Sequence, residues 1–226
     1  MEQLYLFSDL ILPLKCDVNE AHEKLKELKE LGPVIGTDEA GRGALAGPVA
    51  AAAVFLTEEQ EEILLKMNLR DSKLISPERR EKIFEEMKKI GVQWSVSWGS
   101  PELIDEKNIL NASLLKMGEC VKKLAKKLNH NPCCVIVDGN KRIPNINFNQ
   151  WTLIKADKLI PAVSAASIAA KVLRDRLMKN LSKKYPGYDL EKNKGYPTAF
   201  HMEIVKEKGI SVIHRQTFCK KILEIK

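Results

Sequence analysis

Apolar and polar residues recur with two different periods along the chain, and each period predicts its own type of element. Residues 92–98 alternate between apolar and polar side chains, which predicts a half-buried strand. Residues 109–128 carry apolar side chains at helical spacing, and the short apolar run at 133–137 that follows them predicts a buried strand. A helix followed by a buried strand indicates an α/β sheet.

The remaining pattern adds elements before and after this unit. Gly32 and Pro33 end an amphipathic helix predicted at residues 19–31, and Ser76 with Pro77 predicts the start of another helix. The other predicted elements are strands at 34–37, 48–56 and 151–154 and helices at 58–67, 162–183, 198–208 and 216–224. We therefore expect an N-terminal helical extension over residues 1–32 and one folded domain over residues 33–226.

Composition narrows the class of protein. The 226 residues include 37 Lys and Arg against 30 Asp and Glu, a net charge of +7 that favours polyanionic partners, nucleic acid first among them. No segment approaches the ~18 uninterrupted apolar residues of a membrane helix, and no signal peptide is evident. The five cysteines are odd in number and form no C-x-x-C motif, so neither a disulfide framework nor a zinc cluster fits. We expect a cytoplasmic monomer without a membrane partner.

Acidic residues follow the ends of several predicted strands. Asp38 and Glu39 come after the first strand, Asp138 after the run at 133–137, and Asp157 just beyond the strand that ends at residue 154. Adjacent carboxylates on a strand point to opposite faces, so Asp38 and Glu39 can serve one site only if the chain turns at residues 40–41. Each acid taken singly is more simply explained as a turn residue, but ligand sites in open α/β sheets lie beyond strand ends, so these ends can converge.

Clustered carboxylates indicate a particular chemistry. They repel one another, and hard divalent cations such as Mg²⁺ or Mn²⁺ compensate that repulsion. No histidine is placed to favour zinc over these ions. A carboxylate cluster in a basic protein therefore indicates metal-assisted hydrolysis of a phosphodiester.

Several motifs, in a fixed order, resemble those of the ribonuclease HII family. The opening motif is Asp38-Glu39-Ala40-Gly41-Arg42-Gly43, continued by a Leu-Ala-Gly-Pro-Val run at residues 45–49. The others are Asp-Ser-Lys at 71–73, Val-Asp-Gly at 137–139, Lys-Ala-Asp at 155–157, the Ala-rich run at 164–172, Arg-Asp at 174–175, Gly-Tyr-Pro-Thr at 195–198 and His-Arg at 214–215. The resemblance covers residues from about 33 to 218.

The resemblance implies a fold and an activity. The implied fold is ribonuclease H-like, an α/β fold with a central mixed sheet flanked by helices and with extra C-terminal helices. The implied catalytic and metal-binding acids are Asp38, Glu39, Asp138 and Asp157, with Mn²⁺ or Mg²⁺ as cofactor. Family members cleave the RNA strand of RNA–DNA hybrids and nick duplex DNA on the 5′ side of a single ribonucleotide, which leaves 3′-hydroxyl and 5′-phosphate ends, in ribonucleotide excision repair and RNA primer removal. The alternative is another nuclease of this fold, such as a ribonuclease HIII-like enzyme or a junction resolvase.

Further residues are candidates for substrate contact. Gly41 and Gly43 allow the main chain to approach the 2′-hydroxyl that distinguishes RNA from DNA, and Arg42 is expected to hold a neighbouring phosphate. By resemblance, Tyr196 packs on the deoxyribose that follows the ribonucleotide, although on spacing alone a turn before Pro197 is the better explanation. The candidate backbone-phosphate contacts are Lys73, Ser167, Lys171 and Arg215.

Other features favour structural roles. His201 and His214 are more simply structural than catalytic. The basic stripe at residues 122–127 can extend a duplex track, but a charge run on a helix is usually a solvated face.

Overall fold

A mixed β-sheet forms the centre of the computed structural model, which describes residues 12–69 and 75–224. Within these residues the sheet has five strands in the order β3-β2-β1-β4-β5. The strands are β1 (Val34–Ala40), β2 (Val49–Phe55), β3 (Gln93–Gly99), β4 (Cys134–Asp138) and β5 (Gln150–Leu153). The first three pair antiparallel, whereas β4 pairs parallel with both β1 and β5. The expected α/β class with a central mixed sheet is confirmed.

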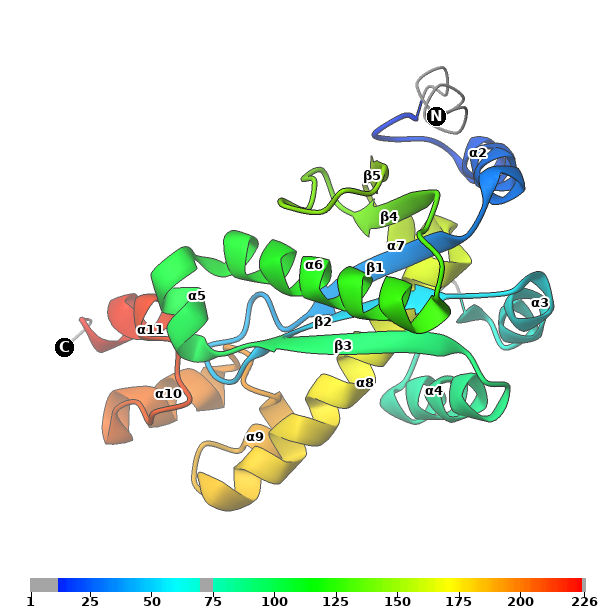
Figure 1. Ribbon diagram of the computed structural model, residues 1–226. Coiled ribbons are helices and arrows are strands. Elements are labelled where there is room, and N and C mark those ends of the chain that lie inside the picture. Colours follow the sequence, from blue (N-terminus) through cyan, green and yellow to red (C-terminus); the bar gives the residue numbers. More distant parts are fainter. Residues whose placement is uncertain (1–11, 70–74, 225–226) are drawn as a thin grey trace.

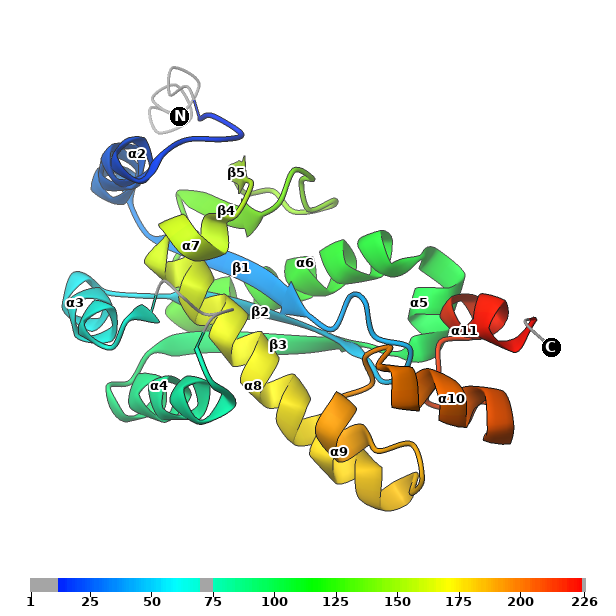
Figure 2. The ribbon, with the colours of Figure 1, turned by 180° about the vertical axis from the view of Figure 1, so that it is seen from behind.

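Two long helices cover the two faces of this sheet. Helix α6 (Ile109–Leu128) lies across one face in Figure 1, and α8 (Pro161–Lys184) crosses the other, as Figure 2 shows. The face of α8 toward the sheet is built from buried alanines, which let the two backbones approach closely. At the point of closest approach Gly36 of β1 meets the main chain of Ala162 and Val163.

Shorter helices surround this core. They are α2 (Val18–Leu31), α3 (Glu58–Lys66), α4 (Pro77–Lys89), α5 (Pro101–Lys107), α7 (Ala156–Leu159), α9 (Leu190–Asn193), α10 (Ala199–Lys208) and α11 (Gln216–Leu223). The sequence pattern did not predict α5, α7 or α9, each of which has seven residues or fewer. The predicted cap is confirmed, since the hydroxyl of Ser76 accepts a hydrogen bond from the N–H of Arg79 at 3.3 Å.

Helix α2 packs against the sheet rather than apart from it. Its buried residues Leu25 and Leu28 share one cluster with Ile136 and Trp151. The indole N–H of Trp151 donates to the carbonyl of Pro13 at 2.7 Å, which ties the segment before α2 to β5. Among the described helices, none is both long and apolar enough to cross a membrane.

The first strand corrects one expectation. The first strand was predicted to span residues 34–37 and to end before the acids. In the structure β1 continues to Ala40, so Asp38 and Glu39 lie inside the strand. The reason is the alanine-rich strand β2, which pairs with β1 along its whole length, through Asp38 opposite Ala52 and Ala40 opposite Ala50. The chain turns only after Ala40.

The close contact between β1 and α8 gives a prediction for stability. A Cβ atom at Gly36 would lie 2.4 Å from main-chain atoms of Ala162 and Val163. We expect Gly36→Ala to lower the free energy of unfolding by about 2 kcal/mol, because neither backbone can yield without shifting the core. Gly43→Ala is the control, since nothing lies within 4 Å of its added methyl group. Chemical denaturation measures both, and equal midpoints for the two variants would contradict the contact.

Candidate active site

Acidic residues lie at the same end of three neighbouring strands. Asp38 is in β1, Asp138 is the last residue of β4, and Asp157 lies in α7, directly after β5. Because β1 and β4 run parallel with Thr37 opposite Val137, Asp38 and Asp138 occupy matching positions on adjacent strands. The sheet therefore fixes the distance between these carboxylates.

The environment of Asp38 raises its pKa well above the ordinary value. Its side chain is only 3% exposed, and burial is the largest cause. The charges of Glu39 and Asp138 raise the pKa further, while hydrogen bonds from Ser167 and from the N–H of Glu39, the latter at 2.7 Å, act in the opposite direction. Three acids thus share one electrostatic field, in which the negative charge of Asp38 is disfavoured.

The fourth acid, Asp157, is fully buried. Its helix follows Lys155, which has a left-handed backbone conformation with φ of 63°. The hydroxyl of Ser164 in α8 donates to the main-chain carbonyl of Asp157 at 2.5 Å. The main chain at this acid is therefore held by the long helix that also covers Asp38.

The donor chemistry of these acids fits a hard divalent cation. Carboxylate oxygens are the ligands that Mg²⁺ and Mn²⁺ prefer, and bound cations offset the repulsion that raises the pKa of Asp38. In the side-chain conformations of the described residues, no three acids, histidines or cysteines already surround one point as a metal site does. We infer that the side chains rotate toward an ion when it binds.

Two hollows flank Glu39. One, of about 230 Å³, is lined by Glu39, Ala40, Gly41, Arg80, Ser167, Lys171 and Tyr196. The other, of about 130 Å³, is lined by residues of α6 and the turn after β4 together with Glu39, Arg42 and Asp138. Two of the acids, Glu39 and Asp138, and most of the predicted substrate-contacting residues therefore line these two hollows, whereas the buried Asp38 and Asp157 line neither. Arg80 was not predicted, because nothing distinguishes it from the other charges of α4 in the sequence.

Two cationic side chains approach the ring of Tyr196, which lines the hollow of about 230 Å³. The ammonium of Lys171 lies 5.0 Å from the ring centroid, and the guanidinium carbon of Arg174 lies 5.2 Å from it. Lys171 also pairs with Asp175 at 2.8 Å. Ser167 and Lys171 line the same hollow, as their spacing on one helix face predicted.

The turn at residues 41–43 has two distinct glycines. Gly41 is buried with φ of 96°, and a Cβ atom there would lie 2.1 Å from the guanidinium of Arg174. Gly43 is exposed and has nothing within 4 Å of such an atom. Gly41 thus permits internal packing, whereas Gly43 lies on the exposed side of the turn. Between them, Arg42 is exposed and pairs with Glu39 at 3.2 Å.

The prediction of a phosphate contact for Arg215 is wrong. The side chain is fully buried, and its guanidinium donates to the carbonyls of Gly41, Arg42 and Gly47 at 2.8–3.1 Å. A phosphate cannot reach it without opening the turn. Lys73, the other candidate outside the hollows, lies outside the described residues.

The two histidines form a buried pair beneath Tyr196. His201 Nδ1 lies 3.0 Å from the carbonyl of Tyr196, His201 Nε2 lies 3.2 Å from His214 Nε2, and the N–H of Ser211 donates to His214 Nδ1. These partners assign one proton to each ring, on Nδ1 of His201 and on Nε2 of His214. Burial lowers the pKa of both rings, that of His214 to about 4, so a structural role is supported.

Residues away from this region show a different character. The lysines at 122, 123, 126 and 127 lie on the exposed face of α6, and Lys123 donates a hydrogen bond to the hydroxyl of Ser97 at 2.9 Å.

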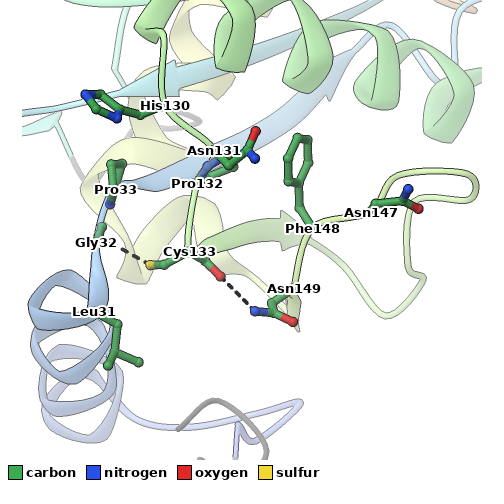
Figure 3. A pocket seen from close by; sticks show the side chains of 10 residues that line it. All are labelled: Leu31, Gly32, Pro33, His130, Asn131, Pro132, Cys133, Asn147, Phe148 and Asn149. Carbon is green, nitrogen blue, oxygen red and sulfur yellow. Dashed lines mark hydrogen bonds between the residues drawn. The ribbon is translucent and has the colours of Figure 1, made fainter. Parts of the chain in front are cut away.

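A larger hollow of about 710 Å³ lies at the opposite end of the sheet, where β1 and β4 begin (Figure 3). There Asn149 donates to the carbonyl of Cys133 at 3.1 Å, and the lining includes no acidic side chain.

The histidine pair gives a prediction for stability against pH. An unfolded histidine binds a proton near pH 6.5, but folded His214 binds one only near pH 4, so the unfolded state holds more protons between these values. We expect the free energy of unfolding to fall as pH drops from about 6.5 toward 4, by on the order of 2 kcal/mol. Denaturation at stepwise pH values measures this loss.

Two glutamine variants separate this effect from general acid sensitivity. His214→Gln keeps an N–H donor toward His201 but does not titrate, so its stability should depend less on pH. His130→Gln, at an exposed histidine, should follow the wild type. An unchanged pH dependence in His214→Gln would refute the account.

Known proteins resemble this chain in sequence and in fold. The model of the family described as Ribonuclease HII matches residues 35–221. The chain is 45% identical over 192 residues to the ribonuclease HII of Caldicellulosiruptor bescii, covering 85% of this chain and 89% of that protein. A chain of the PCNA:RNase HII complex from Archaeoglobus fulgidus superposes with a TM-score of 0.67 at 30% identity, covering 85% of this chain and 97% of that one. Bst-RNase HIII in complex with Mn²⁺ superposes with a TM-score of 0.72 over 85% of this chain and 70% of that one, but at 21% identity it supports the fold alone.

Proposed function

The chain belongs to the ribonuclease HII family and is a ribonuclease H hydrolase, and from this premise we propose its reaction and the residues that perform it. The proposed substrates are RNA–DNA hybrids and duplex DNA that contains single ribonucleotides. Cleavage on the 5′ side of the ribonucleotide leaves a 3′-hydroxyl and a 5′-phosphate. The proposed roles are ribonucleotide excision repair and removal of RNA primers.

One observation carries the proposal. The lining of the hollow of about 230 Å³ includes the acid Glu39, the start of the turn after β1 at Gly41, and Tyr196. Acids suited to phosphodiester hydrolysis therefore lie next to groups suited to recognise a sugar. Net positive charge over the whole chain favours a nucleic acid in this place.

We assign Asp38, Glu39, Asp138 and Asp157 to hold divalent cations, Mn²⁺ or Mg²⁺. Bound cations supply an activated water and neutralise the charge that develops on the leaving 3′-oxygen, as two-ion sites do. The protein fixes the acids at adjacent strand ends, so the ligands need little reorganisation beyond side-chain rotation. Burial keeps bulk water from screening the charges on Asp38 and Asp157.

The remaining residues hold the substrate. In the described part of the chain, the N–H groups of Arg42 and Gly43 donate to no protein acceptor, so they are available to a 2′-hydroxyl. We propose that Arg42 and Lys171, which line the two hollows beside Glu39, pair with phosphates of the substrate. The ring of Tyr196 offers an apolar surface to the sugar that follows the ribonucleotide.

Alternative nucleases of this fold are less well supported. A junction resolvase has no need of a group that reads a 2′-hydroxyl, whereas this turn presents open main chain at Gly43. The family model that matches is that of ribonuclease HII. We further propose that the protein acts as a cytoplasmic monomer whose catalytic domain begins near residue 33. Its five cysteines are free thiols, which a reducing compartment would maintain.

Cleavage of defined duplexes tests the proposal. With Mn²⁺ or Mg²⁺, the protein should nick a duplex with one ribonucleotide 5′ to that residue and leave an all-DNA duplex intact. Asp38→Asn and Asp138→Asn should lower the cleavage rate by about 10³-fold or more, because each removes an anionic ligand from the ion site. Gel analysis of the products gives position and rate, and fluorescence anisotropy should show nearly unchanged binding.

A matched control is Glu102→Gln, which removes an exposed acid of α5 and should keep the wild-type rate. Equal cutting of both duplexes by the wild type would refute the proposed specificity. A near-normal rate in Asp38→Asn would refute the assignment of the acids.

A further inference from the structure

Two arginines, Arg174 in α8 and Arg215 before α11, are fully buried beneath the turn that follows β1. Among the described residues, their guanidinium groups donate hydrogen bonds to main-chain carbonyls and form no ion pair. Burial lowers the pKa of Arg215 to about 9, and the charge of Arg174 contributes in the same direction. The fold thus keeps two like charges near each other, and the carboxylates that act on them, Asp175 on Arg174 and Asp105 on Arg215, raise their pKa less than burial lowers it.

Arg174 joins the glycine-rich loop to the segment that carries Tyr196. Its guanidinium donates to the carbonyls of Ala46 and Pro48 at 3.1 and 2.9 Å, and to the carbonyl of Lys194 at 2.9 Å. The same group lies 5.2 Å from the centroid of the Tyr196 ring. The planar guanidinium of Arg174 therefore connects the loop after β1 to the segment that carries Tyr196, and both border the hollow of about 230 Å³.

Arg215 fixes the turn itself. It donates to the carbonyls of Gly41 and Arg42 at the near end of the loop and to that of Gly47 at the far end. It occupies the carbonyls of Gly41 and Arg42, whereas the N–H groups of the exposed residues 42 and 43 donate to no acceptor among the described residues. The loop between β1 and β2 is held by these two cations in addition to the apolar cluster that Ala46 forms with Met178 and Leu190.

A purely structural loop does not require this arrangement. Burying a charge costs several kcal/mol before its bonds are formed, and apolar side chains of similar volume usually stabilise a core at least as well. The rigid fork of a guanidinium, with five N–H donors, instead fixes several acceptors at set distances. The distinctive contribution of a buried guanidinium is therefore that it fixes the relative positions of the carbonyls it binds.

We propose that Arg174 and Arg215 are positioning residues that set the distance between the turn at residues 41–43 and Tyr196, and thereby the selectivity for a ribonucleotide followed by a deoxyribonucleotide. This inference rests on the proposed function, in which the turn reads the ribose and Tyr196 reads the next sugar. Neither arginine touches the substrate. Both act through the main chain and, for Arg174, through the ring of Tyr196.

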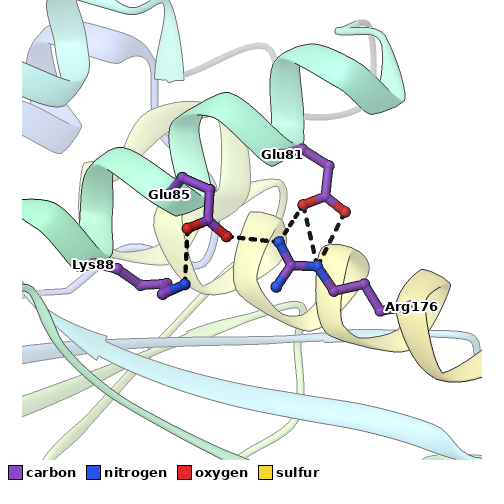
Figure 4. A network of polar contacts seen from close by, with 4 residues as sticks. All are labelled: Glu81, Glu85, Lys88 and Arg176. Atoms are coloured by element: carbon purple, nitrogen blue, oxygen red, sulfur yellow. Dashed lines mark hydrogen bonds and ion pairs between the residues drawn. The ribbon is translucent and has the colours of Figure 1, made fainter.

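Arg176 provides a matched control two residues further along α8. It is partly exposed and pairs with Glu81 and Glu85 of α4, next to a pair between Glu85 and Lys88 (Figure 4). Arg176→Lys weakens a contact between α8 and α4 but leaves the loop and Tyr196 untouched. Arg174→Lys keeps the charge and loses the fork.

The test compares three duplexes with the wild type, Arg174→Lys and Arg176→Lys. The duplexes contain one ribonucleotide, a long RNA strand paired with DNA, or DNA alone. In the long hybrid the sugar that follows the recognised ribonucleotide is itself a ribose, so the spacing to Tyr196 matters less. We expect Arg174→Lys to lower kcat on the single-ribonucleotide duplex at least ~10-fold relative to the long hybrid, since misplacing a reactant by about 1 Å costs up to 10²-fold. Arg176→Lys should keep the wild-type ratio.

Equal losses on both ribonucleotide substrates in Arg174→Lys would overturn the proposal, because they would indicate a general structural role. Assays are run well below the unfolding temperature of each variant. If Arg174→Lys does not fold, the neutral Arg174→Gln takes its place, and failure of both to fold would likewise overturn it. Failure of the proposed function is seen separately, as a wild type that does not distinguish the single-ribonucleotide duplex from DNA.

Discussion

Repulsion among carboxylates that the sheet holds together is the constraint on which this molecule depends. Asp38 and Asp138 are brought side by side by the parallel pairing of β1 with β4, and burial beneath α8 makes the charge of Asp38 costly. These carboxylates stay together only because the packing of the rest of the fold resists their separation. The alanine face of α8 and the absence of a side chain at Gly36 allow that close packing. Under the proposed function, bound cations would relieve this repulsion.

A second group of buried charges lies in the same region of the fold. Arg174 and Arg215 are buried beneath the loop after β1, while the acids lie at the end of the same strand. The two groups differ in what offsets their charge: main-chain carbonyls of the loop accept hydrogen bonds from the arginines, whereas the acids would need divalent cations, as we propose. The net charge of the chain alone indicated a polyanionic partner, but the structure shows that part of the positive charge is internal and organises the loop.

Much of the site was predictable because strand ends leave a local signal. Asp138 before Gly139 and Asp157 after β5 are visible as acids that follow apolar runs, and parallel strands bring such positions together. The burial of Arg215 was not predictable in this way, since an amino-acid sequence does not show whether a cationic side chain faces solvent or main-chain carbonyls. The length of β1 was missed because it is set by pairing with β2, a partner outside the local pattern. Short helices such as α9 were missed because one turn carries too little periodicity.

The most direct test of the account is the position of a bound ion. A crystal of the protein soaked in Mn²⁺ and measured at the manganese absorption edge locates the ion without reference to activity. The account predicts anomalous peaks between the carboxylates of Asp38, Glu39, Asp138 and Asp157, and their loss at the Asp38 position in Asp38→Asn. Manganese bound elsewhere, or not bound at these acids while the protein remains folded, would contradict it.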